Sequence, residues 1–209
     1  MSEKSILFNA DEVRAALAGH KTQVRRPVKP QPPGDARATF AFDRARLVVP
    51  ATFASESSIP DYDCEIMTPW LAGDLLWVRE TWTAPAYEDW KMSEMPQDIH
   101  VRYKATDKNV NDERYTYKWR PSIHMPRWAS RLTLRVKRVW VEQAQDISKQ
   151  DAIAEGVYWS EAFPEMYTWQ DHHRGYGCAE HAFFAMYGFD CMGDINPHLW
   201  ACEFEMVNE

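Results

Sequence analysis

The sequence predicts an α+β fold, a small barrel-like domain of short strands with flanking helices and loop-rich insertions. Three observations support this: apolar strand candidates recur along the chain, two or three helix patterns separate them, and long polar or Pro-rich segments lie between. The chain has 209 residues, 45% of them hydrophobic, which suits one large domain. We expect residues 1–209 to form a single domain with probable insertions at about 31–68 and 84–111.

Strand candidates are short segments in which apolar residues cluster or alternate between turn signals. Leu132–Val141 alternates well, and the Gly73-Asp74 turn signal precedes the apolar run Leu75–Val78. By contrast, residues 158–176 are aromatic and predict irregular structure. Strands are expected at residues 6–8, 39–42, 46–49, 75–78, 101–104, 132–141 and 197–207, the second and third as a possible hairpin.

Three helices are expected. The first runs from Asn9 to Leu17, where apolar residues recur at helical spacing, and Gly19 suits a left-handed stop. The second begins after Asp146 or Ser148 as N-cap and runs to about Glu155, where Gly156 ends it. The third covers residues 179–187.

A basic turn follows the first helix and carries Lys21, Arg25 and Arg26. A guanidinium forms flat, forked hydrogen bonds and an ammonium supplies a point charge, so such a cluster suits an anionic or planar polar ligand. The alternative is a solvated basic turn, as most charge runs are.

The net charge of −7 argues against a general binder of long nucleic acid. Cations are nevertheless concentrated in residues 21–46 and 114–141. If these two segments meet in the fold, they form one basic face on an acidic protein, which could attract an anion locally.

Two further stretches have ligand-binding character. Glu80 and Trp82 share one side of an extended chain just after Trp77 and could line a pocket, although a strand-end ion pair is equally consistent. Residues 119–131 interleave aromatic rings with cations, as base stacking plus phosphate contact would require, and the alternative is a structural loop pinned by tryptophans. The candidate ligand-binding residues of this second stretch are Trp119, Arg120, Ser122, His124, Arg127 and Trp128.

Several classes of protein are disfavoured. The four cysteines include no Cys-x-x-Cys pair, and the spacing of Cys178, His181 and Cys191, with His172 and His173 nearby, fits no zinc signature. We expect neither a metal nor a cofactor. Gly-rich phosphate loops and the Gly-x-Ser-x-Gly elbow are absent from the sequence. No apolar run approaches a membrane span and the first eight residues lack a signal-peptide core, so we expect a cytoplasmic protein without a membrane partner.

Three stretches in order resemble the ASCH family of the PUA-like superfamily, especially its phage and prophage members. They are Leu17-Ala-Gly-His-Lys-Thr-Gln-Val-Arg-Arg-Pro27, Gly73-Asp-Leu-Leu-Trp-Val-Arg-Glu-Thr-Trp82, and Trp119–Arg131 continued by Asp146–Gly156. The closing Asn196-Pro197, with Trp200 and Phe204, is also similar to the final strand of the family. The resemblance implies a small PUA-like β-barrel beside a cleft, and binding of RNA, nucleotides or modified nucleosides.

One branch of this family removes the acetyl group from 4-acetylcytidine and has the pattern Gly-x-Lys-Thr-x-Thr-x-Arg with a later glutamate. The pattern implies catalytic roles for Lys21, Thr22 and Glu155 in this chain and places its arginine on Arg26. Its second threonine, the expected nucleophile, falls on Val24, which cannot act as one. Lys21 and Glu155 could then activate water, Thr22 could replace the nucleophile, or the cleft could bind without reacting.

These observations give three hypotheses. The first is a binding module for a nucleotide, modified nucleoside or short RNA, in which the basic turn contacts phosphate or a base edge and tryptophans stack the base. The second is an amidohydrolase acting on an acylated pyrimidine nucleoside through Lys21 and Glu155. The third is a phage assembly or interaction protein that uses the insertions as contact surfaces.

Overall fold

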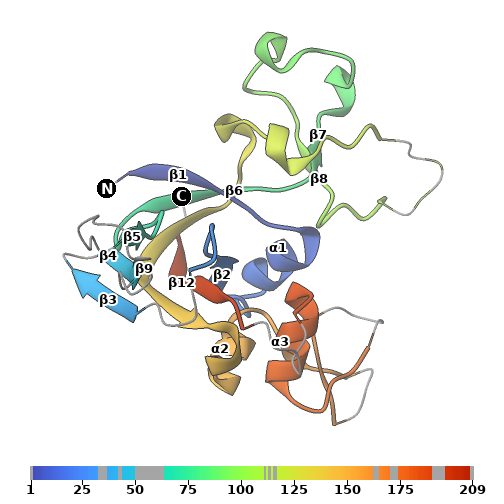
Figure 1. Cartoon of the computed structure of the whole chain (residues 1–209). Helices are drawn as coiled ribbons and strands as arrows, with labels where there is room; N and C mark the ends of the chain where they lie inside the picture. Colours follow the sequence, from blue (N-terminus) through green and yellow to red (C-terminus); the bar gives the residue numbers. More distant parts are fainter. Residues whose placement is uncertain are drawn as a thin grey trace.

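A computed structural model describes residues 2–32, 37–41, 44–49, 64–110, 112, 114, 117–161, 165–169, 174–189 and 196–207. For the described residues within 33–65 and for residue 87 this description covers the backbone alone. It shows a mixed α+β fold, as predicted, with a five-stranded sheet, smaller sheets and three helices (Figure 1). The described strands form no closed barrel, so that part of the expectation is not met. Of the Cys and His residues considered as a zinc site and not accepted as one, His172, His173 and Cys191 lie outside the described residues.

The main sheet has the strand order β1-β6-β9-β12-β2. β1 pairs in parallel with β6, and the other neighbours are antiparallel. β12 therefore lies between β9 and β2, although all three come from distant parts of the sequence. The strands are β1 (Glu3–Leu7), β2 (Gln23–Pro27), β6 (Leu75–Arg79), β9 (Thr133–Gln143) and β12 (His198–Val207).

The three helices form where the sequence predicts them. α1 (Ala10–Leu17) begins with a capping box in which Asn9 and Glu12 bond each other's backbone N–H groups. α2 (Lys149–Ala154) is capped by Ser148. α3 (Ala179–Tyr187) ends at Gly188, whose φ of +69° is a left-handed stop.

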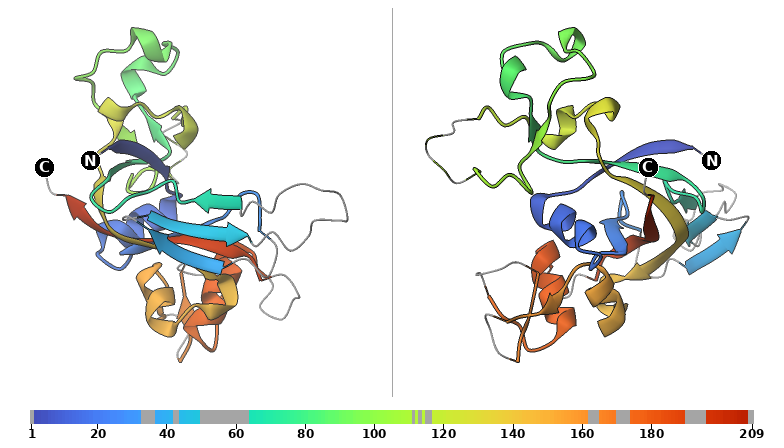
Figure 2. Two further views of the ribbon diagram at one scale, coloured as in Figure 1. Left: turned by 60° about the vertical axis from the view of Figure 1, so that its left-hand side comes forward. Right: turned by 180° about the vertical axis from the view of Figure 1, so that it is seen from behind.

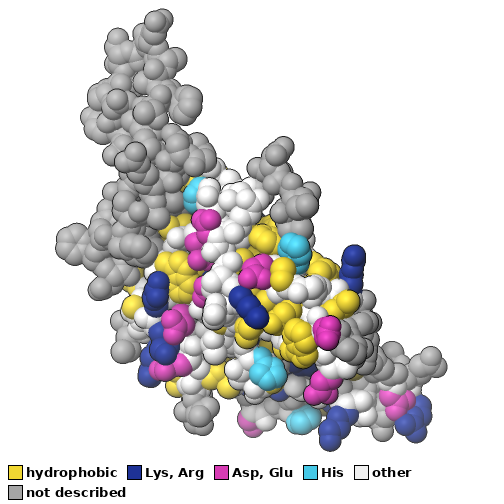
Figure 3. Space-filling view, turned by 90° about the horizontal axis from the view of Figure 1, so that it is seen from below, with side chains coloured by type: hydrophobic (Ala, Val, Ile, Leu, Met, Phe, Trp, Pro, Cys, Tyr) yellow, Lys and Arg dark blue, Asp and Glu magenta, His cyan; other side chains and the backbone are white. Residues whose placement is uncertain are grey.

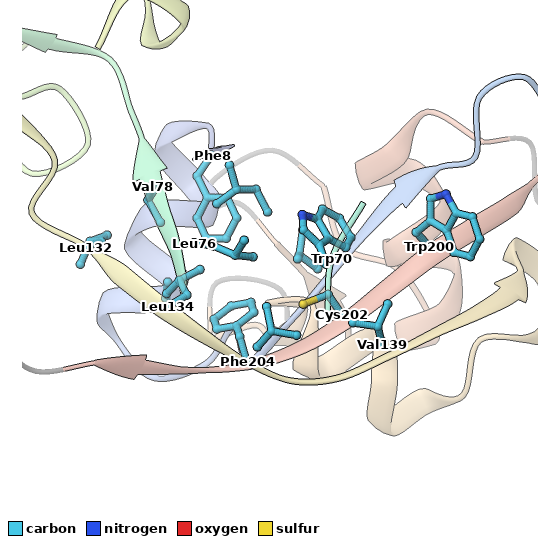
Figure 4. Packing of buried hydrophobic residues seen from close by; sticks show 14 of the residues in the cluster. Phe8, Trp70, Leu76, Val78, Leu132, Leu134, Val139, Trp200, Cys202 and Phe204 are labelled. Atoms are coloured by element: carbon cyan, nitrogen blue, oxygen red, sulfur yellow. The ribbon is translucent and has the colours of Figure 1, made fainter. Parts of the chain in front are cut away.

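Alternation along the strands sends side chains to two cores on opposite faces of the sheet. On β12, Trp200, Cys202 and Phe204 belong to the core that includes α1, while Leu199 belongs to the core that includes α2 and α3. In the first core the rings of Phe8 and Phe204 lie 6.2 Å apart between α1 and the sheet (Figure 4). α1 thus covers one face of the sheet and α2 and α3 cover the other, and residues of all three elements come together around the free edge of β2.

Three small sheets surround this centre (Figure 2). The predicted hairpin at 39–49 is confirmed as β3–β4, and a third strand extends it. The prediction of irregular structure for residues 158–176 is wrong in part, because a short antiparallel pair forms there. The strands are β3 (Arg37–Ala41), β4 (Arg44–Val49), β5 (Cys64–Met67), β7 (Trp82–Thr83), β8 (Arg102–Tyr103), β10 (Tyr158–Trp159) and β11 (Tyr167–Thr168).

β7 and β8 belong to a module, which we call the β7–β8 module, that extends beyond the β6 end of the main sheet (Figures 1 and 2). It has its own buried cluster around Trp82, Met95 and Met125. Most of the predicted insertion at 84–111 lies in it. Its short 3₁₀ turns are η1 (Pro85–Tyr87), η2 (Met92–Glu94), η3 (Ser122–His124) and η4 (Arg127–Ala129), while η5 (Ala144–Asp146) follows β9. No helix of the described chain could cross a membrane.

Acid is expected to loosen the start of the main sheet through Asp74. Burial raises the pKa of this carboxyl, but hydrogen bonds from Lys4, Ser2 and the Leu71 N–H outweigh burial and lower the pKa to about 2. Because the ordinary value is about 3.9, the ionised group stabilises the fold by about 2 kcal/mol above pH 4, and this is lost as the pH falls toward 2. Urea unfolding between pH 2 and 7 should show the free energy of unfolding falling with pH in the native chain, and falling less steeply in Asp74→Asn. Equal pH dependence in the two proteins would contradict the stabilising role assigned to the Asp74 carboxylate.

Candidate functional site

The structure brings Lys21 and Glu155 into direct contact. Lys21 Nζ lies 2.6 Å from Glu155 Oε2 and 2.8 Å from the Glu155 carbonyl oxygen, and both side chains have no exposed surface. The two residues also form an isolated antiparallel bridge. They meet because the chain reverses at Gly19 after α1 and at Gly156 after α2, both with positive φ.

Arg25 and Tyr187 complete the surroundings of the Glu155 carboxylate. Arg25 Nη1 donates to Oε1 at 3.0 Å, and the Tyr187 hydroxyl lies 2.9 Å from Oε2. The same hydroxyl lies 3.0 Å from the Arg25 carbonyl and 3.3 Å from its N–H. Tyr187 therefore holds α3 to the free edge of β2. Burial, followed by the charge of Glu155, raises the pKa of Tyr187 well above its ordinary value, so it remains a neutral hydroxyl.

A second set of carboxylates compensates the remaining positive charge. Arg25 Nε donates to Glu142 at 2.6 Å, and Asp151 lies 3.8 Å from Arg25 Nη2. Arg26 pairs with Glu12 at 3.1 Å, and Lys21 lies 3.9 Å from the same residue. Burial lowers the pKa of Arg25, but Glu155 and Glu142 outweigh it and the net shift is upward. Lys21, Arg25, Glu155 and Tyr187, which we call the Glu155 cluster, are thus a buried and neutralised network.

This arrangement differs from the solvated basic turn that was one alternative. Lys21 and Arg25 are buried, and each already faces a carboxylate. The second basic segment is also neutralised in part, since Arg135 pairs with Glu205 and Lys137 with Glu203 across β9 and β12. Among the described side chains on the face shown in Figure 3, cations are scattered between acidic and apolar side chains and form no broad basic patch.

A small pocket lies beside the Glu155 cluster. Water can occupy about 10 Å³ of it, which is room for about one molecule. Gly156 allows the chain after α2 to approach α1 closely at this pocket, because a Cβ at this position would lie 3.1 Å from the Cβ of Ala15 on α1. Its walls are Asn9, Asp11, Glu12, Ala15, Glu155, Gly156, Trp169 and Met186.

The predicted aromatic site residues lie apart from this pocket, at the end of β6 and in the β7–β8 module (Figure 1). Trp82 is fully buried and meets the edge of Trp128, with ring centroids 5.8 Å apart. Glu80 is buried in a two-pronged ion pair with Arg131. Its pKa is raised because burial outweighs Arg131. The strand-end ion pair is therefore the arrangement found at Glu80.

The remaining predicted residues make mainly structural contacts. Arg120 donates to the carbonyl oxygens of Glu88 and Trp90, and Arg127 pairs with Glu3. Ser122 accepts from Arg79 through its carbonyl oxygen. Trp77 lies under the Arg79 guanidinium, Trp119 packs on Tyr117, and His124 is exposed. The structure does not gather these residues around Lys21.

Val24 and Thr22 do not supply a nucleophile to the Glu155 cluster. Val24 has no exposed surface and belongs to the core on the α1 face, whereas Gln23 and Arg25 contact each other on the opposite face of β2. Thr22 is exposed and its N–H donates to Ala154.

We expect Val24→Thr to destabilise the fold by about 1–3 kcal/mol without creating hydrolytic activity, because it places a hydroxyl in an apolar core. Urea unfolding and chromatography of an incubation with 4-acetylcytidine measure the two effects. Released acetate from Val24→Thr alone, absent in Val28→Thr at another buried valine, would show that position 24 faces the site.

Several site residues carry no obvious signal in the sequence. Glu142 is the residue before the end of the alternating strand β9, and its carboxylate also accepts from Trp140 Nε1 at 2.7 Å. Tyr187 is the last residue of an apolar helix, and Trp169 lies in the segment predicted to be irregular. The one signal available in the sequence was the position of Glu142, a charged residue near the end of an apolar strand.

Within the described part of the chain, no three His, Cys, Asp or Glu side chains are arranged to hold a metal. Cys178 and Cys202 are free thiols. Burial, then Glu155, raises the pKa of Cys202 to about 12, which makes it a poor nucleophile.

Comparison of the chain with protein-family models, with curated proteins and with solved structures gives no match. The class of the molecule is therefore that of its fold and site: a mixed α+β protein with a buried Lys–Glu–Arg–Tyr network beside a small pocket.

Proposed function

We propose that the chain is a PUA-like binding module that takes the base of a nucleoside in the pocket beside Glu155. One observation carries the proposal. Glu155, whose buried carboxylate is fixed by Lys21, Arg25 and Tyr187, lines a pocket that Trp169 also lines, so the carboxylate lies directly behind the pocket wall. A fixed acceptor next to a stacking surface is the combination that recognises a planar base with N–H groups.

Charge favours a neutral base over a phosphate at this pocket. Among the described residues in and around the Glu155 cluster, five carboxylates face five cations, and the cations nearest Glu155 are already paired. The carboxylates are Asp11, Glu12, Glu142, Asp151 and Glu155, and the cations are Arg14, Lys21, Arg25, Arg26 and Arg138. A phosphate there would gain little, because the nearest cations are already neutralised by carboxylates.

The hydrogen-bond inventory indicates what the base would present. Oε2 of Glu155 already accepts from Lys21 and Tyr187, while Oε1 accepts from Arg25 and has one lone pair left. Lys21 uses two of its three N–H donors on Glu155. A ligand edge with one donor beside one acceptor, as on cytosine, would match the remaining lone pair of Glu155 Oε1 and the third N–H donor of Lys21.

Binding a base would require the pocket to open. The present space holds about one water, so Trp169 and Met186 would have to move outward. Met186 lies near the end of α3 and, being unbranched, adapts readily to a new partner. The resemblance to the ASCH family is consistent with this proposal, and with short RNA as a source of the base.

The test is calorimetry with cytidine, 4-acetylcytidine, uridine and cytidine monophosphate. We expect cytidine or its acetylated form to bind and Trp169→Ala to weaken binding about tenfold or more, since stacking on an aromatic ring contributes about 1–3 kcal/mol per base. Trp159→Ala is the matched control, because Trp159 is half exposed and lies outside the pocket. Equal affinity in native protein and Trp169→Ala would refute the pocket assignment.

A second candidate, an amidohydrolase, is favoured by the water-sized space beside Glu155. The water oxygen would attack the acyl carbon while Glu155 takes its proton. The C–N bond then breaks, the proton passes to the leaving amine, and a carboxylic acid and the free amine result. Chromatography of 4-acetylcytidine after incubation distinguishes the two: recovery intact supports a binding module, and cytidine formed by native protein but not by Glu155→Gln supports the enzyme.

A further inference from the structure

A second hollow lies in the β7–β8 module, away from the Glu155 cluster. It has a volume of about 370 Å³ and is formed by β8 and the turn that follows it. Its polar lining is His100, Arg102, Thr106, Asp107, Lys108 and Asn109, and Tyr103 and Val101 supply apolar surface. This volume is within the range of small-molecule sites.

Tyr103, one of the residues that line this hollow, is held in place by side chains and backbone behind it. The Tyr103 hydroxyl donates to the Ala129 carbonyl at 2.9 Å, and the Arg131 guanidinium lies 4.0 Å from the centre of the Tyr103 ring. Arg131 is itself fixed by Glu80, through bonds of 2.8 and 3.0 Å. The buried Glu80–Arg131 pair therefore supports the hollow from behind, which makes its shape pre-organised.

The charged side chains that line the hollow are Arg102, Lys108 and Asp107, which give it a net charge of +1. Its one carboxylate, Asp107, is nearly buried, pairs with Arg102 at 2.7 Å and accepts from the Asn109 N–H at 2.8 Å. Lys108 and His100 are exposed, and neither forms an ion pair with any described residue. The Thr106 oxygen accepts from Arg131, so its own proton remains to donate.

We infer that this hollow binds a small anion, with a phosphate group as the chemistry that fits best. A phosphate offers several acceptor oxygens, and the Lys108 ammonium, the Thr106 hydroxyl and the Asn109 amide are donors spread over one concave surface. The inference does not depend on the nucleoside proposal, because the two pockets share no residue. It assigns a ligand site to the predicted insertion.

The experiment is an NMR titration of the ¹⁵N-labelled full chain with inorganic phosphate, and separately with glycerol 3-phosphate, at constant ionic strength. We expect saturable shifts confined to amides of residues 100–109. Lys108→Ala should weaken binding at least fivefold and Lys108→Arg should largely retain it. Lys91→Ala, at an exposed lysine of the same module outside the hollow, should change nothing.

The two ligands distinguish free phosphate from a phosphorylated molecule: tighter binding of glycerol 3-phosphate indicates that the apolar surface also takes part. Shifts that do not saturate, that spread equally over exposed lysines, or that survive in Lys108→Ala would overturn the site. Cytidine affinity in Lys108→Ala should equal that of native protein, so this result is separate from any failure of the pocket beside Glu155.

Discussion

Replacing Lys21 by methionine is expected to lower the free energy of unfolding by about 3–5 kcal/mol, because it leaves the Glu155 carboxylate buried without its closest cation. Methionine keeps most of the volume, so the loss reports on charge more than packing. Urea unfolding followed by circular dichroism measures it. Lys118→Met is the matched control: its ion pair with Asp89 has a similar length of 3.0 Å but is exposed, and such pairs contribute at most about 1 kcal/mol.

The double variant Lys21→Met with Glu155→Gln sharpens this test. If the cost of the single substitution comes from the stranded carboxylate, the double variant should lose less than the sum of the two single losses. Additive losses would contradict the pairing. If Lys21→Met lowers the free energy of unfolding as little as Lys118→Met does, Lys21 is exposed to solvent. It would then be available to contact a ligand, as predicted from the sequence.

Trp82→Ala is expected to cost about 3–5 kcal/mol, the usual loss for a large aromatic side chain in a core. Trp82 has no exposed surface and packs with Met95, Met125 and Trp128 at the centre of the β7–β8 module. Cytidine affinity should not change, because the indole lies in a different cluster from the pocket. Thermal unfolding and calorimetry on the same preparation measure both quantities.

The comparison for Trp82→Ala is Trp90→Ala, in the same module, where the side chain is about half exposed. We expect a change of no more than about 1 kcal/mol there. A nearly unchanged stability in Trp82→Ala together with lost cytidine binding would support the original interpretation, in which this tryptophan stacks a base.

Elements with strong local signals could be predicted from the sequence. α1 has its capping residue and a glycine stop, β9 alternates, and the Gly73 turn precedes β6. These signals depend on neighbours a few residues away, so they survive without knowledge of the fold. The strand order, in contrast, is set by contacts between residues far apart in the sequence. For this reason neither the parallel pairing of β1 with β6 nor the open sheet could be predicted.

The site was predicted only in part, for a related reason. Lys21 and Glu155 were named together from a family resemblance, and they do meet. A cation in a turn is expected to be solvated unless the carboxylate that pairs with it is known. Glu155, which pairs with Lys21, and Glu142, which pairs with Arg25, are each more than a hundred residues away in the sequence. Tryptophans give an equal signal whether they fill a core or line a cleft, which is why the sequence does not distinguish Trp82, which is buried in a core, from Trp169, which lines the pocket.

The place of β12 between β9 and β2 constrains how the chain can assemble during synthesis. β2 emerges from the ribosome early, yet β12 is its one partner among the described strands, and Tyr187 must also appear before the free edge of β2 is covered. Until then Lys21 and Arg25 lack the residues that bury them. β2 therefore lacks its sheet partner for most of translation, and a ribosome stalled before β12 would hold a nascent chain that chaperones and proteases could recognise.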